Sequence, residues 1–409
     1  MYGFPSRRSS ISISGATLIA AILAVVSQLL GDLDFANQDP IENFLGDYRI
    51  ASFSPRAPRQ RPDIALVTIT EDTLRDYPYV SPIPRRLLAK LIEEIARASP
   101  KVIGLDILVD RPSPEDTLLV AATRATTVPI VWGTIDDRYV ASSTRPRMLR
   151  EVIRAQENFI AQAGCKAGHV WLEHRTGLMV QDSATIRYVG ESQVGSPTRD
   201  SFAAVIARMA GHPHEPSTTR IAWLRSPPDT ATPLFAELQV RRHSPSDLDS
   251  KSPLLSEAEA SLLKGRIVLV GATLDDRDRH KTPLNPAGGL LMPRLMIHAQ
   301  AIAQRIDGDR DIRSLPDWLV LAIFFLSAFV CLRPGIRKVP KTAAIALGVI
   351  GLIAYTASNV EFPTGRLIFI AAAAVTIASV GRRLSLWLWL QLRRPSAEAN
   401  NLPKRGAPS

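Results

Sequence analysis

Four long apolar runs lie near the two ends of the chain, and the middle region has none of that length. The first run, residues 11–30, contains no charged residue. Twenty residues in a helix rise about 30 Å, the hydrocarbon thickness of a typical bilayer. The other runs occupy residues 317–333, 342–358 and 366–381. We therefore expect four transmembrane helices, one before and three after a folded module at residues 31–316.

Basic residues beside these runs predict how the chain is oriented in the membrane. Arg7 and Arg8 precede the first run, and further bases separate the second run from the third and follow the fourth. The loop 358–366 has only one base and one acid. Positively charged flanks stay in the cytoplasm. The N-terminus (1–10) and the basic tail (382–409) are then expected to be cytoplasmic, and the module extracytoplasmic, in a bacterial inner membrane.

The first run has one alternative interpretation, a cleaved signal peptide, because Arg7 and Arg8 form a positive n-region. Its apolar core is long, however, and no clean small-x-small cleavage site follows close to the end of that core. These two features favour a retained membrane anchor.

The first part of the module alternates strand and helix. Residues 63–70 are a short, apolar, β-rich run, which is typical of a buried strand. In residues 81–100 apolar side chains recur at helical spacing, and residues 101–108 have the pattern of a second buried strand. A strand–helix–strand unit of about 45 residues predicts parallel strands. We expect an α/β, three-layer-like domain with a largely parallel sheet.

The remaining elements are expected at shorter intervals. Residues 31–61 are predicted to be a juxtamembrane connector with some helical or strand character. Residues 226–253 are rich in Pro, Ser and Asp, which predicts a long surface loop with a short helix near 232–240. Further helices are predicted at 115–126, 148–163, 201–211 and 296–306, and further strands at 128–135, 168–174, 177–183, 184–190, 220–225 and 263–273.

Composition narrows the classes of partner. The mean hydropathy of +0.05 is ordinary for a soluble protein, but the average hides the segregation of apolar residues to the ends. The net charge of +10 sits largely beside the apolar runs. The tail after residue 391 holds four bases and no aromatic residue, so we expect no nucleic-acid partner. The two cysteines, Cys165 and Cys331, are not expected to pair.

Five residues are candidate ligand contacts. Glu71 follows the first strand of the unit, at the place where ligand clefts form in α/β sheets. Asp106 lies inside an apolar strand, where a carboxylate must be hydrogen-bonded or face a polar cleft. With Arg85 it would form either a buried ion pair or part of a sensing pocket. Thr273 ends a glycine-containing turn that is either an anion contact or a structural turn. His298, near that turn, would sense pH through its imidazole.

Motifs for catalysis, metals and nucleotides are absent. The chain has no Gly-x-x-x-x-Gly-Lys-Ser/Thr, no His-Glu-x-x-His and no Gly-x-Ser-x-Gly. His169 and His174 would point to opposite faces of a strand. The acidic residues at 275, 276 and 278 are interleaved with arginines, which favours a solvated loop over a calcium site. We expect no enzyme activity, no metal and no cofactor.

Several motifs together resemble a known family, the second class of CHASE domain, the cyclase- and histidine-kinase-associated sensory extracellular domain. The first half carries DIALVTITEDTL, SPIPRRLLAKLI and KVIGLDILVD, and the second half KGRIVLVGATLDDRDRHKTP and MPRLMIHAQAIAQ. One membrane helix before the domain and three after it also agree. The chain differs from the family pattern at Thr70–Glu71 and before Pro84–Arg85, so the first pocket is expected to differ chemically.

The resemblance implies a membrane-anchored sensor of an unknown small-molecule or protein signal. Members often carry a kinase, cyclase or phosphodiesterase domain after the last helix, and here only about 20 residues follow, too few for a domain. We therefore expect the signal to pass in trans to a cytoplasmic or membrane partner, with a homodimer compatible with this layout and membrane lipid around the helices. Two alternatives stay open: a structural or assembly subunit without ligand, and a membrane-anchored extracytoplasmic enzyme.

Overall fold

The computed structural model describes residues 40–135, 144–174, 185–189, 200–213, 219–229, 231–250, 252–275, 278–284, 291–308, 310, 312–314 and 360–361. Asn43–Arg313 together with Tyr355–Glu361 form one compact unit, and the rest of the chain forms a second. Among the helices of the described residues, none has both the length and the apolar character needed to cross a membrane. The four predicted transmembrane segments all lie outside the described residues.

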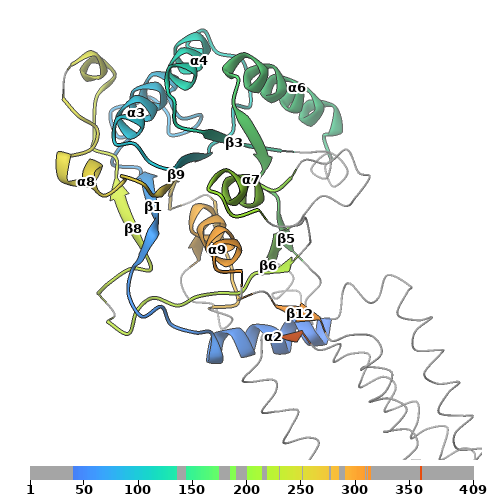
Figure 1. Cartoon of the computed structure of the whole chain (residues 1–409). Coiled ribbons are helices and arrows are strands. Elements are labelled where there is room, and N and C mark those ends of the chain that lie inside the picture. The colour runs from blue at the N-terminus through green and yellow to red at the C-terminus, as the bar shows by residue number, and fades with distance from the viewer. Residues whose placement is uncertain are drawn as a thin grey trace, which may run out of the picture. The chain divides into compact units, whose positions relative to one another are not determined.

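A six-stranded sheet in which every pairing is parallel forms the centre of the first unit (Figure 1). Across the sheet the strands are β4 (Lys166–His169), β3 (Ile130–Thr134), β2 (Val102–Asp106), β9 (Ile267–Ala272), β1 (Arg61–Ile69) and β8 (Phe235–Gln239). The predicted α/β class with a largely parallel sheet is confirmed. The strands of the predicted strand–helix–strand unit, β1 and β2, are parallel, but β9 lies between them.

Helices cover both faces of this sheet and make the domain three-layered (Figure 1). On one face lie α3 (Arg85–Arg97), α4 (Asp116–Ala125) and α6 (Pro146–Ala163); on the other lie α7 (Phe202–Met209) and α9 (Arg294–Asp307). The helical spacing found in the sequence accounts for the docking of α3, because its periodic apolar residues are all buried. Each face therefore has its own apolar core.

A small antiparallel sheet extends the core on the α7 and α9 side. It contains β5 (Leu172–His174), β6 (Ile186–Val189) and β7 (Thr219–Arg220). The helix α2 (Pro40–Phe53) adds Ile50 to the same apolar cluster. The predicted strands at 168–174 and 184–190 are thus confirmed in part, although the first of them is divided between β4 of the main sheet and β5. The predicted strand at 177–183 lies outside the described residues. The remaining elements of the described residues are η3 (Pro245–Asp249), α8 (Glu257–Ser261), β10 (Arg279–His280), β11 (Met292–Pro293), β12 (Arg313–Ser314) and β13 (Val360–Glu361).

Two expectations for the second half of the domain are wrong. Residues 226–253 are not simply a surface loop, because they contain β8, and the predicted short helix near 232–240 is this edge strand. Pairing with β1 and burial of Phe235 and Leu238 outweigh the Pro-rich flanks. The predicted strand at 220–225 pairs within a sheet only at its first residue, Arg220. Two of the residues after Arg220, Ala222 and Leu224, instead make backbone hydrogen bonds with side chains of α9.

Gly168 in β4 allows α7 to approach the sheet at backbone distance. A Cβ atom on Gly168 would lie 2.6 Å from Cα and 2.7 Å from the backbone N of Phe202, the first residue of α7. We expect Gly168→Ala to lower the free energy of unfolding by about 1–3 kcal/mol, because a backbone neighbour cannot rotate away as a side chain can. Urea unfolding of the full-length chain in detergent, followed by tryptophan fluorescence, measures this. Unchanged stability would contradict the close approach.

Candidate functional site

The carboxyl ends of β1, β9 and β2 meet at one edge of the sheet, where the chain leaves toward opposite faces. The chain leaves β1 and β2 toward α3 and α4 on one face, whereas β9 leads to α9 on the other. Such a switch point is where open α/β sheets bind ligands. Glu71, Asp106 and Thr273, predicted from three separate segments, are all brought to this edge.

Asp106 is held by an arginine that the sequence did not single out. It is the last residue of β2, lies opposite Gly271 of β9 and is 4% exposed. The Nε atom of Arg294, the first residue of α9, lies 3.2 Å from the carboxylate of Asp106. The backbone N–H of Arg294 also donates to the carbonyl of Asp278 at 2.8 Å. The start of α9 is thereby tied to the end of β2 and to the loop after β9.

His298 lies one helical turn beyond Arg294, on the same face of α9. Its ring is fully buried and packs edge-on against Phe202, with ring centroids 5.3 Å apart. Burial lowers the pKa of His298 to about 4; the carboxylate of Asp106 opposes this shift, and Arg294 and His280 add to it. Within the described part of the chain, neither ring nitrogen has a hydrogen-bond partner. At neutral pH His298 is therefore a neutral imidazole with unused donor and acceptor capacity.

Arg85 does not pair with Asp106, so the predicted ion pair between these two residues is wrong. The Nε of Arg85 donates to Oδ1 of Asp116 at 3.0 Å, and the other oxygen of Asp116 accepts from the backbone N–H of Ser113. Arg85 is 3% exposed and starts α3, while Asp116 starts α4. The pair joins the beginnings of two helices on one face of the sheet, whereas Arg294 approaches Asp106 from α9 on the opposite face.

Glu71 and Thr273 link neighbouring loops of the carboxyl edge. Oε1 of Glu71 accepts from the backbone N–H of Asp275 at 2.6 Å, and the N–H of Thr273 donates to the carbonyl of Ile69 at 3.0 Å. In the described residues after Thr273, the strands β10 and β11 come before the next helix, α9. A Cβ on Gly271 would lie 2.9 Å from Leu295 Cδ1. The absent side chain at Gly271 thus makes room for α9, which accounts for this glycine by helix packing.

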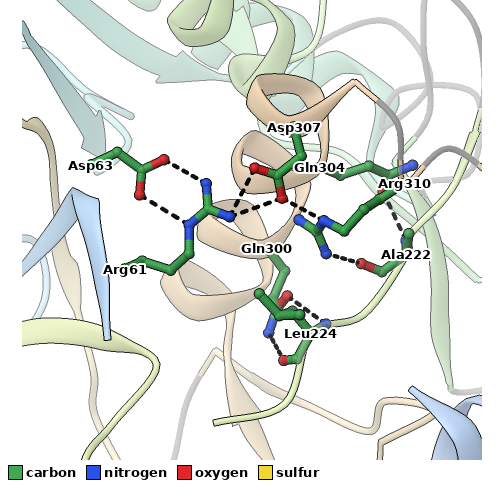
Figure 2. A network of polar contacts seen from close by, with 8 residues as sticks. All are labelled: Arg61, Asp63, Ala222, Leu224, Gln300, Gln304, Asp307 and Arg310. Carbon is green, nitrogen blue, oxygen red and sulfur yellow. Dashed lines mark hydrogen bonds and ion pairs between the residues drawn. The ribbon is translucent and has the colours of Figure 1, made fainter. Parts of the chain in front are cut away.

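The far half of α9 is held by a network of polar contacts, which Figure 2 shows. The side chain of Gln300 exchanges two hydrogen bonds with the backbone of Leu224, at 2.8 and 3.1 Å, and Gln304 accepts from the N–H of Ala222 at 2.8 Å. At the helix end, Asp307 pairs with Arg61 and Arg310. Two glutamines spaced by four residues therefore supply the extended backbone after β7 with hydrogen bonds that a neighbouring strand would otherwise make.

The comparison with protein families matches a family model described as the CHASE2 domain to residues 17–332. The chain belongs to the CHASE2 family. CHASE2 is a family of sensory extracellular domains, not a catalytic one. No curated protein and no solved structure matches the chain.

Other candidate chemistry of the CHASE2 domain has structural explanations where the residues are described. Burial raises the pKa of the Cys165 thiol to about 12, so the group stays protonated and is a poor nucleophile. The Nδ1 atom of the buried His169 accepts from the N–H of Trp171 at 3.2 Å. Among the described residues, no group of three or more histidine, cysteine or acidic side chains is placed to hold a metal ion. Cys331, Asp276 and the side chain of His174 lie outside the described residues.

Of the Asp106–Arg294–His298 cluster, the sequence predicted Asp106 in β2 and His298 in α9 as site residues. It did not predict Arg294, which contacts Asp106. The available signal was spacing, because Arg294 lies four residues before His298, and residues four apart on a helix share a face; the predicted helix, however, began only at residue 296. The same signal was present for Gln300 and Gln304. Asp116, the partner of Arg85, carried no such signal, because only the tertiary fold brings the starts of α3 and α4 together.

Proposed function

We propose that this CHASE2 protein is a membrane-anchored extracytoplasmic sensor that binds a small polar molecule at the carboxyl edge of its sheet and passes the signal to a partner protein. The observation that carries the proposal is the buried, unbonded ring of His298 beside the Asp106–Arg294 ion pair. Buried polar groups are nearly always hydrogen-bonded, so an exception calls for an explanation, of which a functional role is one. A ligand that donates to or accepts from this ring would satisfy it and would compete for Arg294 or Asp106.

The position of α9 supports a route from this site toward the membrane. Its first two turns hold Arg294 and His298, and its last residue is Asp307. The helix is about 21 Å long at 1.5 Å per residue, and the predicted membrane segment at 317–333 begins ten residues after it ends. A ligand that binds one position of α9 more tightly than another would shift the population toward that position. The four predicted membrane helices would carry the shift across the bilayer.

A ligand screen with matched variants tests the proposal. The full-length chain in detergent micelles is heated with single amino acids, dicarboxylates, sugars and polyamines, and the unfolding temperature is recorded. We expect at least one compound class to raise it, and His298→Gln to weaken that compound's binding tenfold or more. Asp249→Asn, which removes an exposed carboxylate paired with Arg86, is the control and should leave binding unchanged. A ligand that binds the wild type and His298→Gln equally would place the site elsewhere.

A further inference from the structure

The helix α2 turns charged as well as apolar side chains toward the domain and leaves part of an aromatic face outside. Asn43, Asp47 and Arg49 are buried together with the apolar Ile50. Phe44 and Leu45 are half-buried and Tyr48 is exposed, and these three share one side of the helix. Tyr48 is 50% exposed, and its ring contacts that of Phe44 with centroids 4.9 Å apart. A helix on the surface of a soluble domain usually turns its apolar stripe inward. The outward aromatic face of α2, Phe44, Leu45 and Tyr48, therefore calls for an apolar surrounding outside the domain.

The inward face of α2 holds the helix in this orientation. The carboxylate of Asp47 accepts from Nε and Nη2 of Arg187 at 3.0 and 2.7 Å, and from Arg220 at 3.2 Å. Arg187 and Arg220 come from β6 and β7 of the small sheet, and both side chains are fully buried. Rotating α2 to hide its aromatic face would pull Asp47 away from two buried guanidinium groups. The outward face is thus a fixed property of the fold.

We propose that the outward aromatic face of α2 lies on the surface of the lipid bilayer, so that the sensory domain rests on the membrane through this helix. The inference rests on the proposed function in one respect, the anchoring of the chain by residues 11–30. Only nine residues separate the end of that run from Pro40, where α2 begins. Nine residues span at most about 30 Å, which keeps the start of α2 within reach of the headgroup region.

Composition around α2 agrees with a lipid surface. Tyrosine and phenylalanine side chains are favoured at the membrane interface, where the ring sits among headgroups and acyl chains. The exposed Arg56 and Arg59 follow the helix directly, and their charge would attract anionic headgroups. A second copy of the chain is less suited to cover this face of α2 than lipid is. One face of a 14-residue helix offers roughly 200 Å², far below the roughly 800 Å² per partner of a stable interface.

Site-directed fluorescence in vesicles tests the docking. Cys165 and Cys331 are replaced by serine and alanine, and an environment-sensitive NBD label is attached to Tyr48→Cys or, as the control, to Met148→Cys on α6. Met148 is 48% exposed, nearly the same as Tyr48. The full-length variants are reconstituted into vesicles of phosphatidylethanolamine and phosphatidylglycerol with a doxyl-labelled lipid. We expect the label at 48 to be quenched several-fold more than the label at 148.

Equal quenching at the two positions would overturn the docking. A label at 48 that is shielded from water but not quenched by the doxyl lipid would show that protein covers α2, and this too would overturn it. Flotation of the same vesicles after an alkaline wash separates the two proposals. A chain that fails to float refutes both the membrane anchor and the docking, whereas a floated chain with an unquenched label refutes the docking alone.

Discussion

Replacing Asp47 by asparagine is expected to lower the free energy of unfolding of the domain by about 3–5 kcal/mol, the range for removing one partner of a buried ion pair. The carboxylate is 5% exposed, and the guanidinium groups of Arg187 and Arg220 that it contacts are 0% exposed. An amide keeps the volume but removes the negative charge that offsets two buried positive charges. Urea unfolding of the full-length chain in detergent, followed by tryptophan fluorescence, measures the loss.

Asp249→Asn is the matched control for this substitution. Asp249 pairs with Arg86 at 2.6 Å, but the carboxylate is 76% exposed, so water and salt replace the interaction when it is lost. We expect the control to change the free energy of unfolding by at most about 1 kcal/mol. Comparable losses in the two variants would mean that the Asp47 cluster is solvated, and that α2 is not fixed by it.

The second large effect is a pH dependence that comes from His298. Its pKa is lowered from 6.5 to about 4 in the folded domain. Between these values the unfolded chain binds a proton that the folded domain excludes, so stability falls as the pH falls from about 6.5 to about 4 and levels off below that. A difference of about 2.5 units corresponds to about 3 kcal/mol at pH 4 and below.

The variant His298→Gln isolates this contribution from those of the carboxylates. We expect wild type to lose about 3 kcal/mol more than His298→Gln between pH 7 and pH 4, measured by urea unfolding across that pH range. His212→Gln, which removes a histidine just after α7, is the control and should keep the wild-type profile. If wild type and His298→Gln follow parallel profiles, His298 is accessible to protons in the folded domain, and the buried, unbonded ring that supports the proposed ligand site is ruled out.

Much of the architecture of the domain is encoded in local patterns of the chain. Periodic apolar residues predict α3, and short β-rich runs predict β1, β2 and β9, because burial on one helix face or on both faces of a strand leaves a regular trace. The α/β class and the placement of Glu71 just past the end of β1 follow from these patterns. The tertiary structure added that Asp106 and Thr273 lie at the same edge of the sheet. The family is also recognisable from motifs in both halves of the chain.

Other features depend on contacts between residues far apart in the chain. The edge strand β8 was predicted as a short helix within a surface loop, because pairing with β1, more than its own composition, makes it a strand. The connector at 31–61 gave no sign of α2 as a helix with its polar face inward, because the charges that hold it, Arg187 and Arg220, come from distant strands. Likewise, the tertiary structure paired Arg85 with Asp116 and Asp106 with Arg294. The sequence by itself determined where most of the buried strands and helices lie along the chain, whereas the order of the strands across the sheet came from the tertiary structure. Only the tertiary structure decided which buried charges form ion pairs. The interaction between two charges depends on their distance in space, and it leaves no periodic signal along the chain.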